Sequence, residues 1–379
     1  MRTQFPRTYR KMMFTLSLSL LFVLLLIACS GSKTSQPPTT PTTVQENTPP
    51  METAQASNPA TSTAETEALP PTATVPAPTP TEEPSPTTTL PPTATPVPTE
   101  TPLPPTPTDT ATPTLGIGST RTIAIDQMVQ IYVPAGEFLM GAADSDEEAK
   151  RTIAGGRAYP ENPQHTVYLD GYWIDKYEVT NRQYALCVAA GACELPWVTS
   201  SYTYDKYYGN PEFDNYPVIW VNWFKVRDYC TWAGRRLPTE AEWEKAARGT
   251  DGAMYPWGNE PLDGTRANFC DVNCTRTHAL DTVNDGYPDT APVGSYPAGA
   301  SPYGAMDMSG NVWEWVSSLI APYPYDANDG REDPDSPDER AWRGGPWSNG
   351  YWWMRSSVRY RSVNWYQWYV LGFRCASSE

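Results

Sequence analysis

The chain has 379 residues, a formal net charge of −16 at pH 7, and a high content of 41 Pro, 15 Trp and 23 Tyr. An acidic excess of this size argues against nucleic acid as a partner, because phosphates demand a basic surface. It is compatible with bound Ca²⁺, which takes oxygen ligands.

Residues 1–28 have the layout of a lipoprotein signal peptide. Basic residues precede an apolar run from Phe14 to Ile27, which is short for a membrane-spanning helix, and Cys29 follows. Small residues before a cysteine resemble a bacterial lipobox, in which Cys29 would carry the lipid. The alternatives are an ordinary signal peptide and an uncleaved anchor. We expect an extracytoplasmic protein that is lipid-anchored through Cys29 to a bacterial membrane surface.

Residues 29–115 are predicted to be a disordered stalk. They consist almost entirely of Pro, Thr, Ser, Ala and Glu, with too few apolar side chains to form a core. Such segments are solvated and biased towards polyproline II. Residues 116–379 hold nearly all the aromatic residues and are long enough to bury a large core as a single domain.

The predicted strands come first in this domain. Residues 128–141, MVQIYVPAGEFLMG, alternate as two strands about a turn, and residues 165–180 indicate a second hairpin. Helical periodicity follows in "NRQYALCVAAG" and "NWFKVRDYCTWAG", with Asn181 and Asn222 as N-caps.

The clearest predicted helix is LPTEAEWEKAARG. Thr239 and Glu242 make a capping box, Glu244 and Arg248 are spaced to pair, and Gly249 ends the helix. After it the chain indicates loops and short strands rich in Trp, Gly and Pro. The predicted fold class is therefore α+β with a large share of irregular structure.

Six cysteines follow Cys29, an even number that favours disulfides in an exported protein. Two pairs are close in sequence and would each close a short loop, which leaves a third: Cys187 with Cys193, Cys270 with Cys274, and Cys230 with Cys375. An alternative makes Cys270, Cys274 and His278 zinc ligands, although a fourth ligand is not evident.

An ordered series of motifs spans the domain. It includes "VPAGEFLMG", "YEVTNRQY", "RRLPTEAEWEKAARG", "YPWGNE", "DMSGNVWEW" and "RGGPW...VLGFRCA". Together these motifs resemble the sulfatase-modifying-factor family, that of the formylglycine-generating enzyme. The resemblance implies a loop-rich fold related to C-type lectins, with structural Ca²⁺, and supports the Cys230–Cys375 link.

The resemblance also implies two calcium sites. The side chains would come from Asn268 and Asp285 in the first and from Asp307 and Glu314 in the second, with main-chain carbonyls from Phe269 and Tyr287, and from Gly310 and Val312. These are oxygen ligands of the kind that Ca²⁺ takes. The alternative is that Asp307 and Glu314 only cap turns.

The segment GGPWSNGYWWMRSSVRYRS, residues 344–362, occupies the place of the family's active segment. Family members oxidise a cysteine of a sulfatase peptide with O₂ and copper, which two of their own cysteines hold. Here the resemblance places Asn349 and Met354 at those two positions and Pro346 at a serine. A thioether can touch copper weakly, but an amide cannot act as a thiolate. We therefore expect neither copper nor the family's oxidase activity.

Two hypotheses about function remain. The first is a non-catalytic module that binds a peptide, glycan or protein, because Trp, Tyr and Arg suit binding surfaces. Its candidate residues are Trp347, Asn349, Tyr351, Trp352, Arg355 and Arg359, with core packing as the alternative for at least half of this segment's Trp, Tyr and Arg side chains. Trp313 and Trp315 are expected in the core. The second hypothesis is an oxidase that acts on a protein cysteine through an altered metal site around Met354.

The remaining residues single out no other chemistry. His165 and His278 are too few for a three-histidine iron site, and no G-x-S-x-G elbow is present. Arg235 and Arg236 are expected to be solvated surface.

Overall fold

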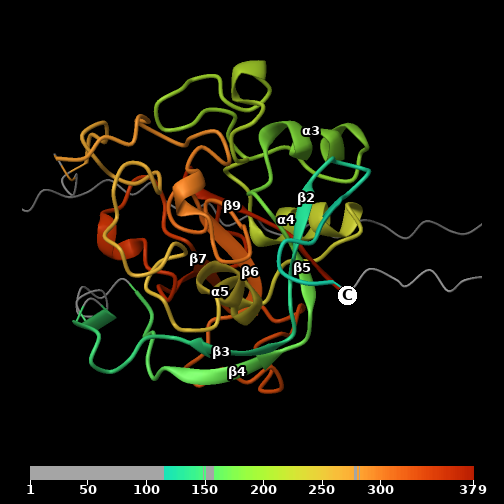
Figure 1. Cartoon of the computed structure of the whole chain (residues 1–379). Coiled ribbons are helices and arrows are strands. Elements are labelled where there is room, and N and C mark those ends of the chain that lie inside the picture. Colours follow the sequence, from blue (N-terminus) through green and yellow to red (C-terminus); the bar gives the residue numbers. More distant parts are fainter. Residues whose placement is uncertain (1–114, 148, 151–157, 277–279, 281) are drawn as a thin grey trace, which may run out of the picture. The chain divides into compact units, whose positions relative to one another are not determined.

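The computed structural model describes residues 115–147, 149–150, 158–276, 280 and 282–379. The predicted signal peptide, Cys29, nearly all of the stalk and His278 lie outside the described residues. Within the described part, no helix combines the length and the apolar character needed to cross a membrane. The domain mixes short strands with few helices (Figure 1), which confirms the predicted α+β class.

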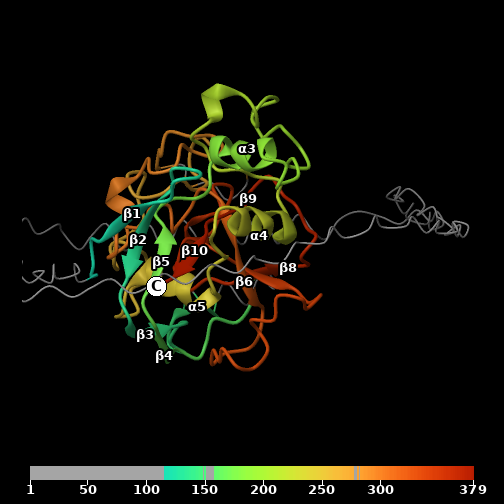
Figure 2. The ribbon, with the colours of Figure 1, turned by 90° about the vertical axis from the view of Figure 1, so that its right-hand side faces the viewer.

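One four-stranded sheet combines the first and the last strands of the described domain (Figure 2). Its order is β1-β2-β5-β10, and all its pairings are antiparallel. The strands are β1 (Thr120–Thr122), β2 (Val129–Val133), β5 (Tyr172–Asp175) and β10 (Ala376–Ser378). All four residues of β5 are buried, so this strand anchors the sheet to the core.

The two predicted hairpins are wrong in their pairing, although their four strands form where the sequence placed them. β3 (Gly136–Met140) pairs with β4 (His165–Leu169), while β2 pairs with β5. The segment that contains β2 and β3 therefore runs antiparallel to the segment that contains β4 and β5, as one bent ribbon. Alternation of apolar residues identifies a strand but does not choose its partner.

A glycine at the bend of this ribbon permits close packing. A Cβ atom at Gly171 would clash with Tyr132 Oη. A larger residue at position 171 would therefore have to displace the end of the Tyr132 side chain, which glycine leaves in place.

A second four-stranded sheet, in the order β8-β7-β6-β9, lies across the middle of the domain. Its strands are β6 (Trp313–Leu319), β7 (Arg340–Arg343), β8 (Tyr360–Ser362) and β9 (Leu371–Phe373), with β6 and β9 parallel. Trp313 and Trp315 are buried, as predicted, and Trp342 meets Trp315 edge-on at a ring separation of 5.2 Å. These indoles form much of the main core.

Helix α3 begins one residue earlier than predicted. The N-cap of α3 (Asn181–Ala189) is Thr180, whose side chain accepts a hydrogen bond from the Gln183 amide. The predicted cap, Asn181, instead donates its side-chain amide to the Phe213 carbonyl at 3.0 Å. Helix α4 (Trp223–Trp232) has Asn222 as its N-cap, as predicted. Short 3₁₀ turns occupy Pro211–Phe213, Pro297–Gly299 and Tyr351–Trp353.

Helix α5 (Glu240–Arg248) lies at the centre of the domain (Figure 1) and every one of its residues is buried. The predicted capping box between Thr239 and Glu242 is present, and Glu244 pairs with Arg248 at 2.9 Å. A helix this polar can be central only because its charges have partners on other elements. Glu240, for example, accepts from both Arg343 and Arg359.

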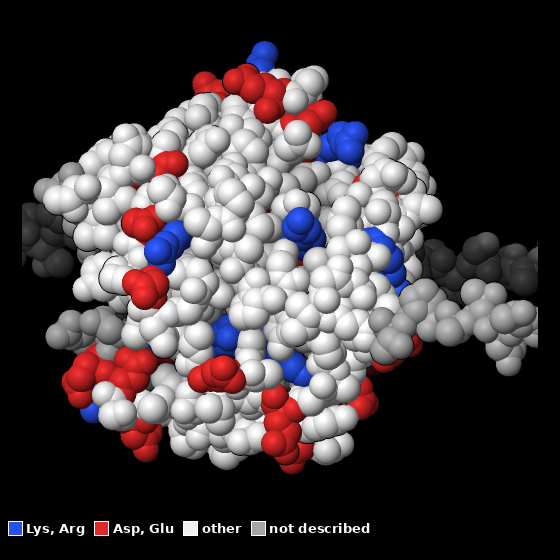
Figure 3. Space-filling model, viewed as in Figure 1, with Lys and Arg blue, Asp and Glu red and all other residues white. Residues whose placement is uncertain are grey.

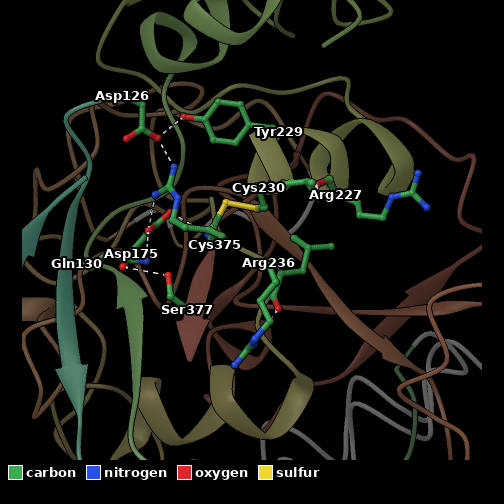
Figure 4. The surroundings of a disulfide bond; sticks show 12 residues. Asp126, Gln130, Asp175, Arg227, Tyr229, Cys230, Arg236, Cys375 and Ser377 are labelled. Carbon is green, nitrogen blue, oxygen red and sulfur yellow. Dashed lines mark hydrogen bonds and ion pairs between the residues drawn. A yellow bond between two sulfur atoms is a disulfide. The ribbon is translucent and has the colours of Figure 1, made fainter. Parts of the chain in front are cut away.

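The three predicted disulfides are present: Cys187–Cys193, Cys230–Cys375 and Cys270–Cys274. The second joins α4 to the residue that precedes β10 (Figure 4).

Arg235 is not solvated surface, contrary to the sequence-based expectation. Its guanidinium donates to Asp175 Oδ1 at 2.6 Å and also to Asp126, and all three side chains are buried. Asp126 accepts a further hydrogen bond from Tyr229 Oη at 2.7 Å (Figure 4). Because both carboxylates come from distant parts of the sequence, the Arg-Arg pair alone gives no sign of this burial.

Candidate binding surface

Three of the predicted binding residues are buried and cannot contact a ligand directly. Trp347 and Arg355 are each 1% exposed, and Arg359 is 0% exposed. The half-buried members of the predicted set are Asn349, Tyr351 and Trp352. The core-packing alternative therefore holds for half of the six predicted residues.

Buried carboxylates explain why these arginines point inward. Both guanidinium Nη atoms of Arg355 donate to the Glu161 carboxylate at 2.7 Å. Arg359 donates to both oxygens of Glu240, also at 2.7 Å. A paired guanidinium can be buried where an unpaired one cannot. The acidic partners lie more than 100 residues earlier in the chain, so the Arg-rich segment alone predicts exposure.

Asn349 and Met354, which the sequence resemblance predicts at the positions of the family's active cysteines, differ in their surroundings. Met354 is fully buried and packs in the main core, whereas Asn349 is half-buried and its carbonyl accepts from the Cys270 amide at 3.0 Å. A Cβ at Gly345 would lie 2.4 Å from the Trp353 carbonyl oxygen, so this glycine is needed for the segment to fold back. All six cysteines from Cys187 onward are disulfide-bonded.

A group of exposed and half-buried aromatic side chains lies beside this segment rather than in it. We call this group the aromatic surface. Its exposed members are Trp197 (66%), Trp365 (65%), Tyr202 (50%) and Phe224 (38%), and its half-buried members are Trp220, Trp368 and Tyr369. These residues come from the loop after α3, the start of α4 and the segment before β9.

Main-chain hydrogen bonds hold the three segments of the aromatic surface side by side. The Trp197 amide donates to the Trp220 carbonyl at 3.0 Å, and the Trp220 amide donates to the Trp368 carbonyl at 3.1 Å. The Trp223 amide donates to the Asn364 carbonyl at 3.0 Å. The surface is therefore built on a fixed backbone, although its segments are irregular.

Ring contacts make the aromatic surface continuous with the predicted segment. Trp197 contacts Trp220 at 5.7 Å, and Trp220 contacts Tyr369 at 6.0 Å. Tyr202 contacts both Tyr369, at 5.3 Å, and the buried Trp347, at 5.6 Å. The buried Nε1 of Trp347 has no hydrogen-bond partner among the described residues. Trp347 therefore supports the aromatic surface from below.

Arg276 adds a cation to the aromatic surface. Its guanidinium lies 5.2 Å from the Tyr202 ring centre and 5.5 Å from that of Tyr369, and it donates to Tyr369 Oη. An arginine held between two tyrosines offers fixed donors beside apolar area, which is a common composition for binding sites.

The sequence carries a weak signal for part of the aromatic surface. The stretch VNWYQWYV, residues 363–370, holds four aromatic residues in eight positions. Trp365, Trp368 and Tyr369 have helical spacing, but the segment is irregular in the structure, so this spacing does not tell which rings are exposed. The neighbouring rings in the loop after α3 were not predictable from this stretch.

The first predicted calcium set includes an unsatisfied oxygen. Asn268 Oδ1 is buried and has no hydrogen-bond donor in the described part of the chain. The Asp285 carboxylate accepts from the main-chain amides of Phe269 and Tyr287, both at 2.9 Å. Burial raises the pKa of Asp285 to about 7, against the effect of these two hydrogen bonds. An orphan oxygen beside a buried carboxylate fits a hard cation.

The second predicted calcium set is partly engaged by protein groups. Glu314 pairs with Arg374 through both oxygens at 2.7 Å, and Asp307 accepts from the Gly294 amide at 2.6 Å. Burial raises the pKa of Asp307 to about 6. The buried Glu178 carboxylate interacts electrostatically with both acids, and burial followed by those two neighbours raises its pKa well above the usual range. The three carboxylates thus outnumber the guanidinium of Arg374.

No three Asp, Glu, His or Cys side chains converge as a metal site among the residues that the structure describes. Each predicted calcium set contains only two side chains and depends on main-chain carbonyls for its other ligands.

The domain is a loop-rich α+β structure with short sheets around a buried central helix, and its Gly-Gly turn leads into a segment with buried arginines. These features define a formylglycine-generating-enzyme-like fold. The family model of the sulfatase-modifying factor enzyme 1-like domain matches residues 118–379. The chain therefore belongs to this family, as its motifs predicted.

Similar proteins agree with this assignment. The formylglycine-generating enzyme of Streptomyces coelicolor is 35% identical over 296 residues, which cover 65% of this chain and 88% of that protein. The corresponding enzyme of Thermomonospora curvata is 36% identical over 226 residues, covering 49% of this chain and 70% of the enzyme. The solved structure of PvdO from Pseudomonas aeruginosa is similar in fold, with a TM-score of 0.56, 24% identity, and coverage of 70% of this chain and 100% of PvdO.

Proposed function

We propose that this domain is a non-catalytic binding module that holds a peptide, glycan or protein ligand on the aromatic surface. A lipid on Cys29 and the stalk of residues 29–115 would hold it at a bacterial membrane surface. The observation that carries the proposal is the exposure of Trp197, Tyr202 and Trp365 on a fixed backbone. Exposed large apolar side chains that gather on one surface mark interaction sites, and ring contacts link Trp197 and Tyr202 through Trp220 and Tyr369.

The composition of the aromatic surface suits ligand binding. Trp and Tyr combine a large contact area with one polar tip and few rotatable bonds, so they lose little entropy when a ligand covers them. The face shown in Figure 3 carries acidic side chains in separate groups and only scattered basic ones. This arrangement gives phosphate groups little to bind, so nucleic acid is not the proposed ligand.

Disulfide pairing favours binding over the oxidase alternative. The family's copper chemistry needs thiolates, and the six cysteines from Cys187 onward are each half of a disulfide. Met354 is sequestered in the core. Titration with Cu(I) and an assay for oxidation of a cysteine peptide test the alternative, and turnover would support an altered oxidase instead.

The aromatic surface can be tested by truncation of two exposed rings. Glycan and peptide arrays should first identify a ligand for the wild-type domain. The double variant Trp197→Ala/Trp365→Ala should then bind it at least about tenfold more weakly, because each buried aromatic anchor contributes about 2 kcal/mol. Its melting temperature should stay within about 2 °C of wild type, because exposed side chains contribute little to stability.

The matched control for this experiment is Ile117→Ala. Ile117 is 67% exposed and lies just before β1, outside the aromatic surface. Equal binding by the double variant and the wild type would exclude the aromatic surface as the site. A loss of binding caused by the control as well would show an effect that is not specific to this surface.

We further propose that the predicted sets hold structural Ca²⁺. The orphan Asn268 Oδ1 supports the first set, and the excess of carboxylates around Asp307 supports the second. At a Ca²⁺ concentration of 100 times Kd, bound ion adds about 2.7 kcal/mol, so EDTA should lower the melting temperature by about 5 to 10 °C. Differential scanning calorimetry measures this shift.

The control variants separate the first set from general charge effects. Asp285→Asn should reduce the stabilisation by Ca²⁺, while Asp263→Asn should preserve it, because the Asp263 side chain is 48% exposed and its partners are the neighbouring Thr265 and Arg266. Identical melting curves in EDTA and in Ca²⁺ would refute the calcium proposal and leave the binding proposal unaffected.

A further inference from the structure

A cavity of about 530 Å³ lies between the β4–β5 turn, the start of α5, the loop at residues 325–332 and β10. Tyrosines and carboxylates dominate its lining, among them Tyr168, Tyr325, Asp170, Glu242 and Glu332. None of these residues belongs to the aromatic surface or to the predicted calcium sets. The volume falls within the range of small-ligand sites.

Glu332 is a carboxylate of this cavity that forms no ion pair within the described ranges. Tyr325 Oη donates to Glu332 Oε1 at 2.9 Å, Ser317 Oγ donates to Oε2 at 2.9 Å, and Ser318 Oγ donates to Oε1 as well. The guanidinium groups of Arg340 and Arg236 interact with Glu332 electrostatically without forming an ion pair with it. Burial raises the pKa of Glu332.

The one guanidinium in the cavity is already neutralised. Arg236 donates to both oxygens of Glu242, at 2.7 and 2.6 Å. Figure 4 shows the Arg236 side chain extending from the disulfide region towards α5. Among the described lining residues, Asp170 at the exposed edge and the half-buried Glu332 form no ion pair, so the lining offers carboxylates to a cation.

We propose that this cavity binds an ammonium group on an aliphatic chain, either a free alkylamine or the lysine side chain of a peptide, with Glu332 as the counter-charge. An ammonium group carries three N–H donors, which suit carboxylate oxygens. The exposed ring of Tyr168 covers the aliphatic chain and favours a cation near its face. The Tyr325 ring already holds the Arg331 guanidinium at 4.8 Å from its centre. Recognition therefore depends on charge, and a neutral chain of equal length binds poorly.

Isothermal titration calorimetry on the purified domain tests this proposal with three probes. The probes are 1,5-diaminopentane, N-acetyl-lysine amide and the neutral N-acetyl-norleucine amide. At least one of the two amines should bind saturably and the norleucine amide should not. Binding of the lysine amide alone identifies a peptide as the source of the ammonium group, and binding of the diamine alone identifies a free amine.

Two variants locate the site. Glu332→Gln keeps the shape of the side chain and should weaken amine binding by about tenfold or more, because hydrogen bonds to charged groups are the strong ones. Glu339→Gln is the matched control, since Glu339 is 42% exposed and pairs with Arg361 elsewhere, and it should change binding by less than about twofold.

Tyr168→Ala keeps the test decisive if Glu332→Gln fails to fold. This exposed ring can be removed without disturbing the core, and amine binding should weaken by about threefold. The proposal is overturned if neither amine binds at millimolar concentration, if the norleucine amide binds as tightly as the lysine amide, or if folded Glu332→Gln binds like wild type. These outcomes do not depend on the aromatic surface.

Discussion

Replacing Arg355 with leucine should lower the free energy of unfolding by about 3 to 5 kcal/mol, because Glu161 then stays buried without its cation. The two side chains share two hydrogen bonds of 2.7 Å, and they are 1% and 0% exposed. The remaining partner, Ser357 Oγ, donates to Glu161 at 2.7 Å but brings no charge. Urea-induced unfolding followed by tryptophan fluorescence measures the loss.

Arg361 provides the matched control, because it lies on the same segment but is 46% exposed. Arg361→Leu should cost less than about 1 kcal/mol, as is usual for surface ion pairs. The double variant Arg355→Leu/Glu161→Leu should regain part of the loss, since it removes the unpaired charge. Wild-type stability of Arg355→Leu, combined with lost ligand binding, would contradict the buried pair and return Arg355 to the binding residues.

Loss of the Cys230–Cys375 disulfide is the second large effect expected. The bond spans 145 residues, so its removal by Cys230→Ala/Cys375→Ala should cost about 4 to 5 kcal/mol in the chain-entropy model. The Cys187–Cys193 bond spans only 6 residues, and the corresponding double alanine variant should lose about 2 kcal/mol. Comparing the two double variants separates the effect of loop length on the free energy of unfolding from the effect of removing the sulfur atoms.

Equilibrium unfolding of the two double variants, under identical oxidising conditions, checks this order. Equal losses would show that packing around the sulfur atoms, rather than loop length, sets the contribution of each bond. A larger loss for the short loop would contradict the expectation outright.

The family and the fold class were predictable because their signal is carried by local motifs in a fixed order. The capping box at Thr239 and Glu242 and the pairing of Glu244 with Arg248 involve residues three or four apart, where helix geometry alone decides contact. The disulfides followed from cysteine spacing and from the family resemblance. In each case the deciding partners are either close in sequence or limited to a small set.

Contacts between distant segments account for what the sequence did not predict. β2 pairs with β5 rather than with β3. The sequence does not predict this pairing, because several apolar strands are interchangeable as partners until the whole sheet is assembled. The sequence predicts that Arg355 and Arg359 are exposed donors, but in the structure they are paired with the buried carboxylates of Glu161 and Glu240. A charged residue is buried or exposed according to its partner, which its own segment does not contain.

The candidate site shows the same limit. Trp347 was expected to contact ligand, but Tyr202 and Tyr369 lie over it and take the outer position. Trp197 comes from a loop about 150 residues earlier, and its main-chain hydrogen bond and ring contact with Trp220 place it on this surface. In an irregular segment the spacing of aromatic residues does not assign them to a face.

The sheet that combines β1 and β2 with β10 has a consequence for the order of folding. β10 pairs with β5, which lies about 200 residues earlier in the chain, and β9 pairs in parallel with β6. Both four-stranded sheets therefore lack a strand until residues 371–378 have been made. Topologies with such long-range pairs fold slowly, because the conformational entropy of the long loop is lost before the stabilising contacts between its ends form. The domain therefore stays incompletely folded until residues 371–378 have been made, and its assembly is a cooperative event that waits for these strands.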